Sequence, residues 1–359
     1  MPSKTCLILR SMAGRRPGRA SRRTQGVAAA LLLGLASLPA AAEVPAPPGG
    51  GFGLPVDCDM DSLCSVQNYI DHDPGPGWRD HTCGPLSYDG HRGIDFRVPT
   101  QIEMRRGVAV VAAADGRVLI ARDGQPDILM QDTGPGTNVD ERNGNWVAID
   151  HGGGWVTTYA HLLQGSVAVE NGQRVERGEK LGLIGLSGNS DFPHVHFAVT
   201  HENRLLDPFI GEEPGAVCGE AGTSLWSPEA EAQIPYRAGG LLSAGFLDRQ
   251  PTHREVLDGI DAPDRLAADA PVLIFWTGSW GLLEGDLMSL TILGPDGEVF
   301  VAADHTLERN RATQSRWIGK RRREDPWPPG RYTGLYRVER QQAGATITVI
   351  EVSRDIEVR

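Results

Sequence analysis

The pattern of apolar and polar positions changes along the chain and predicts two β-rich regions. From residue 91 to about residue 209, short runs of β-prone residues alternate with glycines, and no long stretch has the period of an amphipathic helix. The runs cover residues 108–112, 116–121, 146–150, 155–160, 180–184 and 194–200. This pattern predicts a mostly antiparallel β domain.

A second β-rich region follows a segment at 211–229 that carries glycine, proline, glutamate and serine and is typical of a linker. Its candidate strands cover residues 271–277, 287–293, 298–302, 332–339 and 345–358, and a Gly-Pro-Asp-Gly turn lies at 294–297. Short strands at this spacing favour a β-sandwich of immunoglobulin-like type. The expected fold class is all-β with two domains, which suits a length of 359 residues.

The first 42 residues are typical of a secretory signal peptide. They hold seven basic side chains and no acidic one, followed by an apolar run at 27–38 and a Pro-Ala-Ala-Ala sequence at 39–42. The apolar run is shorter than the roughly 20 residues that span a bilayer. We therefore expect an exported protein, periplasmic or extracellular, with no stable membrane span once the leader is removed; the export route stays open.

The charge of the chain argues against a nucleic-acid partner. The sequence has 35 basic and 46 acidic residues, a net charge of −11, and removal of the seven basic residues of the leader leaves 28 − 46 = −18. A chain this acidic is repelled by a phosphate backbone. We therefore expect no nucleic-acid binding.

Four cysteines lie outside the leader: Cys58, Cys64, Cys83 and Cys218. An even set in an exported protein predicts two disulfides, and the absence of a C-x-x-C pair disfavours a structural zinc site. The three possible pairings stay open, although a bridge from Cys218 would clip the linker to the first β region. The segment before residue 88 is expected to be held by disulfides rather than by burial.

Histidine and carboxylate side chains gather in three patches of the first β region. His91 and Asp95 form an H-x-x-x-D motif, His161 ends the run that begins at residue 155, and His194 and His196 form an H-x-H motif. Because side chains alternate faces along a strand, His194 and His196 should point the same way. Together the patches supply enough groups for a metal site with three protein ligands, an open position and two supporting residues.

These motifs resemble those of the lysostaphin/LytM zinc endopeptidases, whose signature is H-x-x-x-D followed by H-x-H. The resemblance covers residues 88–209 and includes a glycine-rich approach to the H-x-H strand. It implies that His91, Asp95 and His196 bind one zinc ion per chain, while His161 and His194 act on the substrate. It also implies an exported zinc metalloendopeptidase that hydrolyses stem peptides of cell-wall peptidoglycan through a zinc-activated water.

The expected organisation has five parts: a signal peptide at 1–42, a disulfide-held segment at 43–87, a zinc metallopeptidase domain with a LytM-like sheet at 88–210, a linker at 211–229 and a β-sandwich domain at 230–359. The alternative is a non-catalytic wall-binding or regulatory protein that uses the peptidase fold to recognise a partner. The complete motif set favours the enzyme. The bond cleaved, the role of the C-terminal domain, the oligomeric state and latency through the N-terminal segment stay open.

Overall fold

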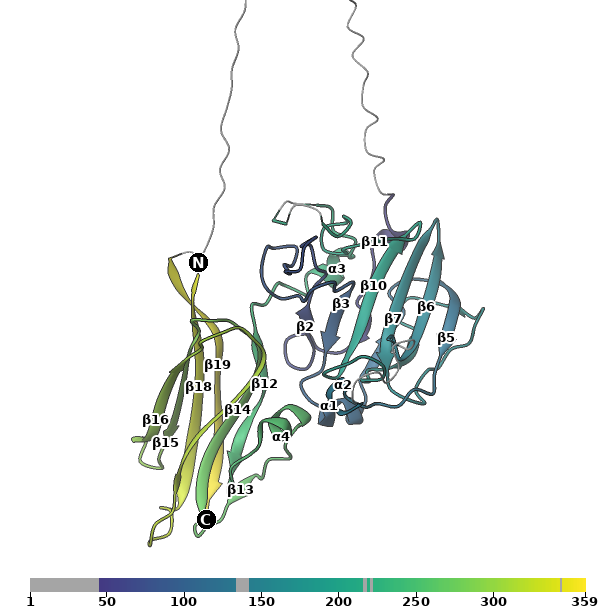
Figure 1. Ribbon diagram of the computed structural model, residues 1–359. Coiled ribbons are helices and arrows are strands. Elements are labelled where there is room, and N and C mark those ends of the chain that lie inside the picture. Colours follow the sequence, from purple (N-terminus) through teal and green to yellow (C-terminus); the bar gives the residue numbers. More distant parts are fainter. Residues whose placement is uncertain (1–44, 134–141, 216–217, 220–221, 343) are drawn as a thin grey trace, which may run out of the picture. The chain divides into compact units, whose positions relative to one another are not determined.

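The computed structural model describes residues 45–359 except for 134–141, 216–217, 220–221 and 343 (Figure 1). The predicted signal peptide at residues 1–42 lies outside the described residues. Within the described part of the chain, no helix is long and apolar enough to cross a bilayer.

An eight-stranded antiparallel sheet forms the framework of the first β region (Figure 1). Its strands are ordered β2-β3-β10-β7-β6-β5-β8, and β11 also pairs with β10. The strands are β2 (Ser65–Asn68), β3 (Ile94–Arg97), β10 (His194–His201), β7 (Trp155–Leu162), β6 (Asn145–Gly152), β5 (Gly116–Arg122), β8 (Arg174–Val175) and β11 (Arg204–Leu206). Both β3, which carries Asp95, and β10, which carries the H-x-H motif, therefore lie inside the sheet, where neighbours on both sides constrain them.

A smaller antiparallel sheet shares one apolar core with the larger one. It consists of β1 (Val56–Asp57), β4 (Ala109–Val111) and β9 (Lys180–Leu183) in the order β1-β4-β9. Val110 and Leu181 from this sheet are fully buried in the same cluster as Phe96, Tyr159 and Phe197 from the larger sheet. Removal of this apolar area from water stabilises the scaffold.

The helices are short, and three of them begin at polar caps. They are η1 (Pro48–Gly50), α1 (Gln101–Arg106), α2 (Met130–Thr133), α3 (Pro228–Glu231) and α4 (His253–Asp258). The side chains of Thr100, Ser227 and Thr252 accept hydrogen bonds from backbone N–H groups in the first turns of α1, α3 and α4. Such caps satisfy donors that have no partner inside the helix.

The C-terminal region is a sandwich of two sheets. One sheet has the order β12-β14-β17 and the other β13-β19-β18-β15-β16, with only β13 and β19 paired in parallel. The strands are β12 (Gly240–Leu247), β14 (Val272–Leu282), β17 (Arg311–Arg321), β13 (Arg265–Leu266), β19 (Ala345–Val358), β18 (Gly330–Gln342), β15 (Leu287–Leu293) and β16 (Val299–Thr306). The all-β prediction is confirmed. The immunoglobulin-like type and the domain boundaries stay predictions.

A buried ion pair lies inside this sandwich. The Nε and Nη2 atoms of Arg340 donate to the two carboxylate oxygens of Asp286, each at 2.7 Å. The same guanidinium also donates to the carbonyl oxygens of Ala238 at 2.9 Å and Gly281 at 3.0 Å. These bonds offset the cost of removing both charges from water.

The four cysteines form two disulfides, as predicted. Cys58 pairs with Cys64, and Cys83 pairs with Cys218 across 135 positions of sequence. The second bridge ties the segment that follows the first β region to the segment that precedes it. Burial also holds the preceding segment, because Tyr69 lies fully inside the core.

Candidate metal centre

The pairing of β3 with β10 brings the two sequence motifs together. Asp95 lies directly opposite His196 in the antiparallel register. Along β10, Val195 and Phe197 are buried in the core, so the alternating His194 and His196 face the other side of the sheet. The candidate site therefore lies on the face of the sheet opposite the core.

Three donor atoms converge on this face. His91 Nε2 lies 3.1 Å from Asp95 Oδ1 and 3.2 Å from His196 Nδ1, and the last two atoms are 2.9 Å apart. Donors bound to one tetrahedral zinc ion at about 2.0 to 2.2 Å are themselves roughly 3.3 Å or slightly more apart. The three donor atoms of His91, Asp95 and His196 lie slightly closer together than this, and their two-imidazole, one-carboxylate chemistry fits a zinc ion.

Hydrogen bonds with other groups hold the side-chain atoms of His91 and Asp95 that do not face the cluster. His91 Nδ1 donates to the carbonyl oxygen of Tyr69 at 2.7 Å, which places the lone pair of the neutral ring on Nε2. The side-chain amide of Asn68 donates to Asp95 Oδ2 at 2.9 Å and leaves Oδ1 for the cluster. Close approach also requires Gly93, since a Cβ there would lie 2.4 Å from His196 Nε2.

The charge balance favours an ionised Asp95. Burial by itself would raise the pKa of this carboxyl group, but the neighbouring imidazoles of His91 and His194 outweigh burial and hold the pKa well below its usual range. A buried carboxylate with this pKa stays available as a metal ligand at neutral pH.

His161 and His194 lie beside the three-donor cluster. Their ring centroids are 4.7 Å apart, and His194 Nε2 is 3.5 Å from Asp95 Oδ1. His161, the last residue but one of β7, has a φ of 63°, a left-handed conformation that is uncommon for a residue other than glycine. The cost of such backbone is tolerated at functional sites when the surrounding structure enforces it.

Both of these rings present a lone pair to the cleft. His161 Nδ1 donates to the carbonyl oxygen of Ser187 at 2.8 Å, and His194 Nδ1 donates to that of Phe192 at 2.8 Å. Burial lowers the pKa of His194, and burial together with the adjacent imidazoles lowers the pKa of His161 far more. Because a neutral ring with its proton on Nδ1 has an unprotonated Nε2, both residues are proton acceptors at neutral pH.

The cluster opens into a cleft of about 540 Å³. Two aromatic rings that sequence reasoning missed contact its histidines: Tyr88 stacks on His91 with a centroid distance of 4.3 Å, and Phe192 stacks on His194 at 4.5 Å. Their closeness in sequence to the motifs was the only available signal. The cleft is also lined by Asp89, Arg92, Met130, Arg142, Asn143, Asn189 and Asp191.

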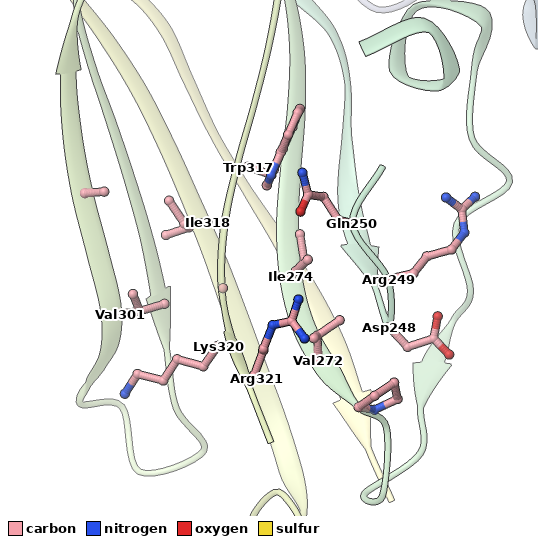
Figure 2. A pocket seen from close by; sticks show the side chains of 13 residues that line it. Asp248, Arg249, Gln250, Val272, Ile274, Val301, Trp317, Ile318, Lys320 and Arg321 are labelled. Carbon is pink, nitrogen blue, oxygen red and sulfur yellow. The ribbon is translucent and has the colours of Figure 1, made fainter. Parts of the chain in front are cut away.

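A second hollow, of about 640 Å³, lies in the C-terminal sandwich (Figure 2). Val272, Ile274 and Trp317 line it together with the cationic side chains of Lys320 and Arg321. Although this hollow is the larger one, its described lining contains no histidine or cysteine. The donor chemistry therefore identifies the smaller cleft as the candidate metal centre.

Comparison with known proteins places the cleft in the matched part of the chain. Residues 89–208 match peptidase family M23. The chain is 28% identical over 186 residues to the cell division protein DipM of Caulobacter vibrioides, covering 52% of this chain and 24% of DipM. It is 31% identical to the peptidoglycan DD-endopeptidase ShyB of Vibrio cholerae over 34% of this chain and 24% of ShyB. The chain thus spans about a quarter of the length of these relatives.

Other similar proteins include an activator and solved peptidase structures. The murein hydrolase activator NlpD of Salmonella typhimurium is 28% identical, covering 38% of this chain and 31% of NlpD. A zinc-containing peptidase from Vibrio cholerae is 27% identical with a TM-score of 0.31, covering 46% of this chain and 41% of that chain. The catalytic domain of lysostaphin from Staphylococcus simulans is 21% identical with a TM-score of 0.27, covering 42% of this chain and 91% of that chain. TM-scores of this size give no support of their own to a shared fold.

Proposed function

We propose that this protein is an exported zinc metalloendopeptidase that hydrolyses stem peptides of peptidoglycan, because residues 89–208 match peptidase family M23. The convergence of His91, Asp95 and His196 carries the proposal. The similarity to ShyB, a peptidoglycan DD-endopeptidase, supports the substrate class. The two disulfides support export, because such bonds persist in oxidising compartments.

Three side chains would hold the zinc: His91 through Nε2, Asp95 through Oδ1 and His196 through Nδ1. When bound, zinc supplies a Lewis acid that lowers the pKa of water and polarises a carbonyl oxygen. His161 and His194 stay outside the ligand set in this proposal. Their Nδ1 protons are committed to backbone carbonyls, which leaves the Nε2 atoms to face the substrate.

The two neutral imidazoles supply the proton transfers. One Nε2 accepts a proton from the attacking water as general base, and the resulting imidazolium can donate that proton to the leaving amine. The second imidazole orients the reacting groups from the other side of the opening. Tyr88 and Phe192 restrict ring rotation by stacking on His91 and His194. Arg92 and Arg142 line the cleft together with Asp89 and Asp191, so that the cleft would offer partners for charged groups of either sign on a wall peptide.

A test of this function measures cleavage of crosslinked muropeptides by the purified protein. We expect one zinc ion per chain, loss of cleavage on chelation, and recovery when zinc is restored. The matched variant His196→Ala is expected to lose both zinc and cleavage. Stoichiometric zinc in this variant would remove His196 from the ligand set.

The alternative is a regulatory role, which the similarity to the activator NlpD favours. The complete donor set argues for catalysis, since an activator needs no ionised carboxylate beside two imidazoles. Zinc-loaded protein that binds muropeptides without cleaving them, while stimulating a separate wall hydrolase, would support the alternative and overturn the enzyme.

A further inference from the structure

The candidate metal centre makes two hydrogen bonds with a segment that lies before the family-matched residues. Asn68, at the end of β2, donates to Asp95, and the next residue, Tyr69, accepts from His91. Asp95 and His91 are both almost completely buried. These contacts therefore hold two of the three candidate ligands from outside residues 89–208.

A β-bulge aims Asn68 at the site. In the pairing of β2 with β3, Val66 lies opposite Phe96, and a regular antiparallel register would then place Gln67 opposite Asp95. Instead the register shifts by one residue, so that Asn68 lies opposite Asp95. The displaced Gln67 bonds to Arg97. Bulges beside functional sites commonly redirect a side chain in this way.

The bond from Asn68 separates the roles of the two carboxylate oxygens of Asp95. Oδ2 accepts from the Asn68 amide at 2.9 Å, whereas Oδ1 lies within 3.1 Å of the donor atoms of His91 and His196. A carboxylate with one oxygen held in this way is oriented to offer the other oxygen to a cation. Partners of this kind typically change metal affinity by about 10-fold to 100-fold.

We propose that Asn68 is a positioning residue of the metal centre, and that the segment around β2 is part of this centre. The proposal rests on the zinc site proposed above, but not on the identity of the substrate. A second contact from the same segment agrees with it: the carboxylate of Asp71 accepts from the backbone N–H of Gly90 at 2.9 Å, which supports the turn that precedes His91.

The test compares zinc affinity among folded variants of the full chain. Asn68→Leu keeps the branched shape in a larger side chain and has no donor, and Asn68→Asp has the same shape but replaces the donor by an acceptor. Val66→Ala is the matched control, because Val66 packs in the core from the same strand. The dissociation constant for zinc is measured by competition with a chromophoric chelator, and unfolding of the zinc-free protein is followed in parallel.

We expect the dissociation constant to rise about 10-fold to 100-fold in both Asn68 variants. Val66→Ala is expected to unfold at a lower temperature yet to keep its zinc affinity within about twofold. Unchanged affinity in the Asn68 variants would overturn the proposal, as would an equal loss in Val66→Ala, because that result assigns the effect to weakening of the strand. If Asn68→Leu does not fold, Asn68→Ser, which is smaller and still polar, takes its place.

Measurements of zinc affinity and of muropeptide cleavage distinguish a failure of this proposal from a failure of the proposed function. Wild-type protein that binds zinc but leaves muropeptides intact would refute the peptidase and leave the role of Asn68 standing. Wild-type protein that cleaves muropeptides and has the same zinc affinity as Asn68→Leu would refute only the role of Asn68.

Discussion

Replacement of His161 or His194 is expected to stop peptide hydrolysis while leaving zinc in place. The expectation follows from the hydrogen bonds of the two rings. Each Nδ1 donates to a backbone carbonyl at 2.8 Å, and burial keeps both rings neutral near pH 7. Each residue therefore offers an oriented Nε2 lone pair. Neither His161 nor His194 is needed to complete the three-donor cluster.

The expected magnitude is that of a general base. Loss of a positioned base reduces turnover by about 10²-fold to 10⁴-fold. At about 1.36 kcal/mol per factor of ten, this range corresponds to roughly 2.7 to 5.5 kcal/mol of transition-state stabilisation. The ring centroids of His161 and His194 are 4.7 Å apart, and the two residues lie on different strands, β7 and β10. One ring therefore cannot simply take the position of the other.

The assay uses His161→Asn and His194→Ala, with His201→Gln as the control. Asparagine is chosen at position 161 because it tolerates the positive φ of 63° without supplying a base. His201 lies at the far end of β10, where its ring contacts Trp155. Zinc content, thermal unfolding and muropeptide cleavage are measured for all three proteins. Near-normal cleavage by a zinc-loaded variant would refute its catalytic role, and combined loss of zinc and activity would make the residue a ligand.

Three further predictions concern metal binding, stability and pH. Gly93→Ala would place a Cβ 2.4 Å from His196 Nε2, so chelator competition should show zinc affinity reduced by about tenfold or more; unchanged affinity would contradict this contact. Arg340→Met leaves the buried Asp286 carboxylate without its partner and should cost about 3 to 5 kcal/mol in urea unfolding, and a cost below about 1 kcal/mol would refute the role assigned to the pair. Burial lowers the pKa of His151 from its usual 6.5. As the pH falls below about 6.5, the unfolded chain therefore binds more protons than the folded chain, and the free energy of unfolding decreases. Between pH 7 and pH 5, the free energy of unfolding should fall less for His151→Gln than for the wild type, and an equal fall would contradict this.

Local sequence patterns determined much of the fold class and of the candidate site. The strand at 194–200 was predictable because apolar residues alternate with histidines, and β10 (His194–His201) follows that alternation. The two disulfides followed from an even number of cysteines, whereas their pairing depended on which Cα atoms the fold brings close together. The strand β17 (Arg311–Arg321) was missed because its sequence is mostly polar and lacks a clear apolar alternation.

Tertiary structure decided how the site is assembled. The amide of Asn68 reaches Asp95 through a bulge and a pairing of strands separated by 27 positions, and no spacing in the sequence marks that contact. The proton acceptors at His161 and His194 depend on carbonyl groups placed by surrounding turns, because every residue has a carbonyl and only the fold selects its partner. The sequence by itself thus determined which side chains can bind a metal or move a proton. Only the packed sheet determined which atom of each side chain faces the three-donor cluster, the cleft or the protein interior.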